Sequence, residues 1–106
     1  MWIQQNSIAL GALRTALGEV AIAFDHADRK ALTTKLVACA NATVSLARTA
    51  AGSLAKDQAE AIATIAEQCA SMAHMTVSGD ATGLAAARPV LDMATATLAA
   101  TFTAAG

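Results

Sequence analysis

Apolar side chains recur at alternating steps of three and four residues in four successive segments of the chain. This spacing places them along one side of an α-helix. The segments predicted to be helical are 7–24, 29–51, 54–76 and 81–102. Their stripes, in the same order, are Leu10, Leu13, Leu17, Val20 and Phe24; Leu32, Leu36, Cys39, Thr43, Leu46 and Ala50; Gln58, Ile62, Ile65, Cys69, Met72 and Thr76; and Leu84, Ala87, Leu91, Ala94 and Leu98.

Short polar segments separate the four predicted helices, so sequential helices should be antiparallel neighbours. We expect turns at 25–28, at 52–53 and at 77–80. The residues predicted to cap or end helices are Asn6 or Ser7, Asp28, Gly52 and Ser53. The pattern predicts a single all-α domain over residues 1–106: an antiparallel up-down-up-down four-helix bundle.

Pro89 lies inside the last predicted helix. It lacks an amide donor, and its ring clashes with the carbonyl group of Ala85. We therefore expect the last helix to be kinked or broken near Pro89. The alternative is a short helix over 81–87 and a second helix that begins at Pro89.

The chain is alanine-rich, with 30 alanines among its 106 residues. Some of them keep a seven-residue spacing beside the stripes, as Ala59, Ala66 and Ala73 do in the third helix. Small residues on one flank of a helix let a neighbouring helix approach closely. The predicted core is therefore thin, and each large side chain in it carries more of the stability.

Charged residues are scarce on this chain. Seven Lys and Arg and eight Asp and Glu make up 14% of the sequence, against about 25% in typical soluble proteins. The net charge is −1 and the basic residues are scattered, which argues against binding to nucleic acid or to an anionic membrane surface. A surface with so few charges favours association, either as a homo-oligomer or with a partner helix.

The longest apolar stretch, residues 8–24, is interrupted by Arg14 and Glu19. It is preceded by no basic segment of the kind that a signal peptide has. We therefore predict no membrane span. Two cysteines without a visible signal favour a reducing, cytoplasmic setting, although a processed secreted form stays open.

Cys39, Cys69 and Met72 are candidate ligands for a soft metal ion, copper or zinc. Cys69 and Met72 share one helix face, but His74 falls on the opposite, polar side of the same helix. The competing interpretation treats the cysteines as small buried hydrophobes and the methionines as gap-filling side chains, and it is the one we favour.

A disulfide between the two cysteines depends on the register of their helices. If the helices pair about the Gly52–Ser53 turn, Cys39 lies level with Ala66, and Cys69 lies one turn farther along. A disulfide needs Cα atoms within about 7 Å of each other. This register argues against a bridge.

No known catalytic motif is present in the sequence, which contains no P-loop, no GxSxG, no HExxH and no dinucleotide-binding glycines. We therefore expect a non-enzymatic protein without a cofactor. A phosphotransfer-like regulatory domain is a further alternative, because His26 precedes Arg29 and Lys30. The neighbouring Asp25 and Asp28 would repel a phosphoryl group, which argues against it.

A second stripe runs along the first predicted helix: Ile8, Gly11, Thr15, Gly18 and Ile22. Glycine inside a helix costs about 1 kcal/mol relative to alanine, so two glycines on one face require an explanation. Close approach of another helix explains them. We predict that this stripe is an interface, through which the protein assembles with itself or binds a partner helix.

Overall fold

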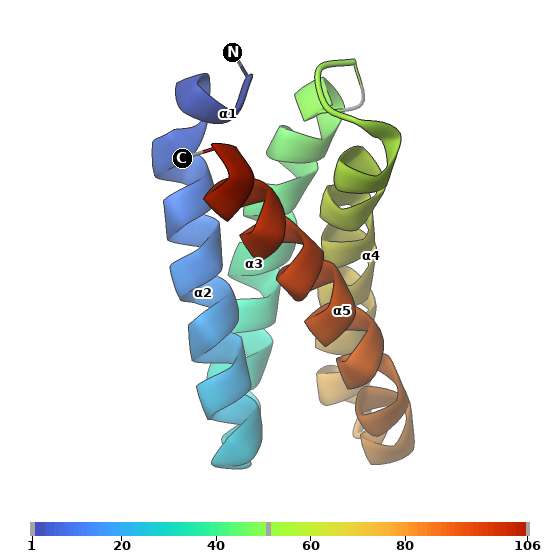
Figure 1. Ribbon diagram of the computed structural model, residues 1–106. Helices are drawn as coiled ribbons and strands as arrows, with labels where there is room; N and C mark the ends of the chain where they lie inside the picture. Colours follow the sequence, from blue (N-terminus) through green and yellow to red (C-terminus); the bar gives the residue numbers. More distant parts are fainter. Residues whose placement is uncertain (1, 51, 106) are drawn as a thin grey trace.

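Four long helices and one short helix make up residues 2–50 and 52–105, the part of the chain that the computed structural model describes; side chains are described within it except at 3 and 101–105. Figure 1 shows the long helices running alternately up and down the molecule. The predicted all-α, antiparallel four-helix bundle is confirmed. The helices are α1 (Trp2–Gln5), α2 (Ser7–Asp25), α3 (Arg29–Ala50), α4 (Lys56–Ser78) and α5 (Ala81–Ala105).

The predicted stripes form the core of the bundle. Their members are buried except for Phe24, Gln58 and Leu84, which are half-buried. Ala66 and Ala73 are also buried, so small side chains do lie at the helix contacts. The most extensive packing joins α3 to α4, followed by α4 with α5 and α2 with α3. In contrast, α2 and α5 touch at only a few points, which leaves one seam of the bundle open.

The chain begins with a helical turn that the sequence pattern did not predict. Trp2 in α1 is buried, and its indole Nε1 donates a hydrogen bond to Thr49 Oγ1 at 2.7 Å. Asn6 is the N-cap residue of α2, but its side chain makes no capping bond and donates instead to the carbonyl oxygen of Trp2. Asn6 therefore holds the predicted N-cap position, but the predicted capping by its side chain is wrong, because its amide donates to α1 instead.

The connection between α3 and α4 is longer than predicted. Helix α4 begins at Lys56, and its N-cap is Ala55, without a side-chain cap. Ser53 does not cap α4, since its amide, like that of Leu54, donates to the carbonyl oxygen of Ala50 and closes the end of α3. The predicted start of this helix at residue 54 is wrong by two residues.

The two remaining turns lie near their predicted places, although α4 continues to Ser78, two residues beyond its predicted end. Asp28 Oδ1 accepts a hydrogen bond from the amide of Ala31 and caps α3, as predicted. Gly79 ends α4 in the left-handed conformation at φ 77°, a region that glycine enters without steric cost. Asp80 then accepts a hydrogen bond from the amide of Gly83 and caps α5.

Helix α5 continues through Pro89 without interruption. The alternative of two separate helices is therefore wrong. In Figure 1 the first turns of α5 run beside α4, and the later turns lean across the bundle toward α2. This oblique course explains why α2 and α5 share so few contacts.

Candidate functional site

The predicted interface stripe lies on the side of α2 that faces away from the core. We call Ile8, Gly11, Thr15, Gly18 and Ile22 the outer stripe. Ile8 is 89% exposed and Ile22 is 61% exposed, so both ends of the outer stripe present large apolar side chains to solvent. Leu10, Leu13 and Leu17, on the opposite side of the same helix, are buried. Helix α2 therefore has two apolar faces, and the bundle covers only one of them.

The two glycines of the outer stripe have no role inside the described chain. A Cβ atom added at Gly11 or at Gly18 would meet no described neighbour within 4 Å. Neither glycine has a positive φ, so no turn requires it. Thr15 satisfies its own hydroxyl group by donating to the carbonyl oxygen of Gly11 at 3.1 Å. The cost of two helical glycines is therefore not offset by any intramolecular close approach in the described residues.

Two charged residues border the outer stripe on opposite flanks. Glu19 faces the α3 side, where its carboxylate lies 2.5 Å from Lys35 Nζ. Arg14 faces the α5 side and lines the open seam. The stripe itself carries no charged residue, so it forms an apolar band between one acidic and one basic flank.

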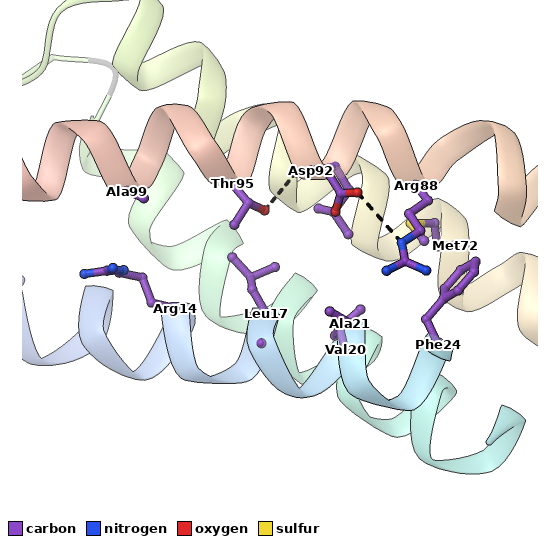
Figure 2. Close-up of a pocket in the computed structure, with 12 residues that line it drawn as sticks. Arg14, Leu17, Val20, Ala21, Phe24, Met72, Arg88, Asp92, Thr95 and Ala99 are labelled. Carbon is purple, nitrogen blue, oxygen red and sulfur yellow. Dashed lines mark hydrogen bonds and ion pairs between the residues drawn. The ribbon is translucent and has the colours of Figure 1, made fainter. Parts of the chain in front are cut away.

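The open seam between α2 and α5 contains a groove of about 280 Å³. Figure 2 shows Arg14 toward one end of this groove and Arg88 beside Phe24 toward the other. Its walls are mainly apolar, with Leu17 from α2 and Leu91 from α5 among them.

Arg88 makes polar contacts across the groove. Its guanidinium group lies 2.9 Å from Asp25 and 3.8 Å from Asp92, and 4.6 Å above the ring centre of Phe24. Two carboxylates therefore balance its charge. This arrangement ties α5 to the end of α2 and leaves the Arg88 end without an excess of positive charge for an anion.

The structure brings the two cysteines together. Cys39 on α3 and Cys69 on α4 are free, fully buried thiols that share a hydrogen bond. The pKa of Cys39 is lowered because the Cys69 thiol donates to it, and the pKa of Cys69 is raised by the same bond and by burial. The predicted one-turn offset is wrong, because the two thiols lie close enough to interact directly across α3 and α4.

The remaining predicted ligands do not gather around the thiols. Met72 is fully buried one turn from Cys69, but it also lines the groove toward α2. His74 is exposed, in agreement with its predicted place on the polar side of α4. Among the described residues, no three His, Cys, Asp or Glu side chains come close enough together to hold a metal ion.

His26 is the C-cap residue of α2 and is exposed. Arg29, the basic neighbour on which a phosphotransfer role depended, directs its guanidinium group elsewhere. It donates to the carbonyl oxygens of Thr76 at 2.5 Å and Val77 at 2.9 Å. The regulatory alternative stays a prediction that no contact of this histidine supports.

By length and composition, α2 is the one helix of the described chain that could cross a membrane. The fold gives another reason for the apolar character of α2: one of its faces packs in the core, and the outer stripe occupies a second face. Arg14 and Glu19 lie within the apolar stretch. The predicted absence of a membrane span stays a prediction.

Two of these features had no usable signal in the sequence. Arg88 is separated from Asp25 by most of the chain, and nothing in the spacing of either residue indicates their contact. The thiol pair depends on the register of α3 against α4, which composition does not fix.

No family model, no curated protein and no solved structure matches this chain.

Proposed function

We propose that this protein is a non-enzymatic helical bundle whose function is to associate with a second copy of itself through the outer stripe of α2. The observation that carries the proposal is the pair of glycines, Gly11 and Gly18, set between exposed isoleucines where the chain itself makes no close approach. Close approach of a second helix gives these glycines a role. The exposed isoleucines then supply the apolar area that the contact buries.

A membrane is the other apolar partner to consider. A helix that lies on a membrane surface usually has a polar face rich in Lys and Arg. Helix α2 instead presents one basic flank at Arg14 and one acidic flank at Glu19. Insertion across the membrane would also remove Leu10 and Leu13 from the core and expose the leucines of α3. Both considerations favour a second copy over a lipid partner.

The proposal is tested by the mass of the protein in solution. We expect sedimentation equilibrium to give an oligomer for the unmodified chain and a single chain for Gly11→Leu and Gly18→Leu, with helical circular dichroism retained in all three. Ala42→Leu adds the same side chain to an exposed position of α3 and serves as the control. An oligomer that persists in both glycine variants would rule out the outer stripe.

A smaller substitution separates the effect of glycine on helix stability from its effect on association. Gly18→Ala should stabilise the folded chain by up to about 1 kcal/mol, since alanine is the better helix former and the site is open. The same methyl group should weaken association, because it holds the two helices apart. Urea denaturation at low protein concentration measures the first effect, and sedimentation measures the second. A gain in stability with unchanged association would contradict the proposal.

Soft-metal binding is a second candidate function, favoured by the hydrogen-bonded thiols of Cys39 and Cys69 beside the buried Met72. Thiolate and thioether sulfur atoms suit Cu(I), and thiolates also suit zinc. The test is the copper and zinc content of the purified protein, with Cys69→Ala as the control. Stoichiometric metal that is lost in the variant would support this candidate, and its absence from the unmodified protein would eliminate it.

A further inference from the structure

We infer that the two copies pair with their α2 helices parallel, so that Arg14 of each copy lies beside Glu19 of the other. This inference rests on the proposed self-association and adds its direction. It is carried by the charges that border the outer stripe.

The outer stripe alone does not select a direction. Its residues read Ile, Gly, Thr, Gly, Ile from either end. In a parallel pair each residue opposes its own counterpart. In an antiparallel pair centred on Thr15, Ile8 opposes Ile22, and Gly11 and Gly18 lie within one residue of opposing each other. The apolar contacts are therefore similar in the two arrangements, and the flanking residues decide the orientation.

The flanking charges favour the parallel arrangement. Arg14 and Glu19 lie roughly 140° apart around the helix and about 7.5 Å apart along it, on opposite sides of the stripe. A two-fold axis along the helices brings the arginine flank of one copy against the glutamate flank of the other. The long arginine side chain can span the remaining offset. One pair of residues thus gives two identical intermolecular ion pairs, as flanking positions do in parallel coiled coils.

The antiparallel arrangement places like charges together. A two-fold axis across the helices brings each flank against the same flank of the second copy. Arg14 lies one residue from Thr15, the centre of the stripe, so the two Arg14 side chains would face each other. Like charges on facing flanks oppose that pairing, and electrostatic complementarity fixes orientation more than it adds affinity.

Glu19 is already held in position for this role. Lys35 of the same chain contacts its carboxylate, and both side chains are only about half-buried, with 42% and 43% of their surfaces exposed. The carboxylate therefore keeps an accessible side on the α3 flank. A second cation, Arg14 of the other copy, can approach it there without breaking the existing ion pair.

Cysteine cross-linking tests the direction. In a parallel pair, Ile8→Cys alone and Ile22→Cys alone should each give a covalent dimer with a short bis-maleimide. A mixture of the two variants should give no Ile8–Ile22 link, because these positions lie about 21 Å apart along parallel helices. The unmodified chain is the control, since Cys39 and Cys69 are fully buried.

The outcomes distinguish the two proposals. Cross-links that form only in the mixture would overturn the parallel arrangement and leave self-association standing. A single-chain mass for the unmodified protein by sedimentation would overturn both. Covalent dimers from each single variant, confirmed by peptide mapping, support the inference.

A charge variant provides an independent readout of opposite sign. Arg14→Gln should weaken a parallel dimer by roughly threefold or more, because it removes two exposed ion pairs. In an antiparallel dimer the same change removes a repulsion and should tighten association. Arg48→Gln, on an exposed part of α3, is the matched control. Tighter association of Arg14→Gln would overturn the inference.

Discussion

Helices α2 and α4 contribute similar inner faces to the same core, but their outer faces differ. The inner face of α4 is buried from Ile62 to Thr76, and that of α2 is buried from Leu10 to Val20. The outer face of α4 carries exposed polar side chains such as Glu67 and His74. The outer face of α2 instead carries exposed isoleucines and two glycines.

This difference shows which helix face the fold of the single chain does not explain. A polar outer face needs nothing further, because water satisfies it. An apolar outer face with small residues at its centre leaves unburied area and an unexplained loss of helix propensity. Only α2 among the long helices presents glycines on such a face in the described residues. The single chain therefore leaves more of α2 than of α4 without a structural explanation.

The inner faces should be equivalent, and truncation of one core residue in each helix tests this. Leu13→Ala in α2 and Ile65→Ala in α4 should each lower the free energy of unfolding by about 2–5 kcal/mol, because both side chains are fully buried. Urea denaturation at low protein concentration measures the loss. A much smaller loss for Leu13→Ala would mean that α2 is peripheral to the core, and the comparison would fail.

The thiol pair on the inner faces of α3 and α4 has no counterpart in α2, and it should make stability depend on alkaline pH. Above the ordinary thiol pKa of 9.0, the unfolded chain releases both thiol protons. In the folded chain Cys39 can ionise, but the raised pKa of Cys69 holds its proton. The folded state then binds more protons, so the free energy of unfolding falls by up to about 1.4 kcal/mol per pH unit.

Chemical denaturation from pH 8 to pH 10 measures this dependence. Cys69→Ala removes the group with the raised pKa and should flatten the fall. If the free energy of unfolding falls as steeply with pH in that variant, groups other than the two thiols cause the dependence.

The link between α2 and α5 should contribute less than either inner face. Arg88→Ala removes its ion pair with Asp25 and its contact with the Phe24 ring, and it should lower the free energy of unfolding by about 1 kcal/mol. A double-mutant cycle with Asp25→Asn isolates the ion pair. A loss as large as that of a core leucine would show that the open seam is closed in solution.

The outer faces should differ in association while both leave folding almost unchanged. Ile22→Ser on α2 removes an exposed side chain of the outer stripe, and Val77→Ser removes a similarly exposed one from α4. Each should change the free energy of unfolding of the single chain by no more than about 0.5 kcal/mol. Only Ile22→Ser should reduce the oligomeric mass. Equal effects of both changes on mass would remove the distinction between α2 and α4.

Much of this fold could be predicted because its information is local. The three- and four-residue spacing of Leu10, Leu13 and Leu17 identifies a buried helix face without reference to any other segment. The same reasoning placed the outer stripe correctly on the opposite side of α2. Asp28 was identified as a cap because its side chain acts on its own helix.

The errors fall where a distant segment or the length of a turn decides the outcome. The Asn6 side chain does not cap α2 because it bonds to the preceding helical turn, α1. Ser53 does not cap α4 because its amide bonds to the last turn of α3. The register of α3 against α4, which brings Cys39 and Cys69 together, was also missed. Pro89 did not break α5, although its chemistry permitted a break.

Sedimentation equilibrium over a range of protein concentrations is the most direct test of the outer stripe. We expect the unmodified chain to approach twice the mass of a single chain as concentration rises, and the Gly11→Leu/Gly18→Leu double variant to stay at the single-chain mass with its helical content intact. The same mass for both proteins at every concentration would contradict self-association through this face of α2.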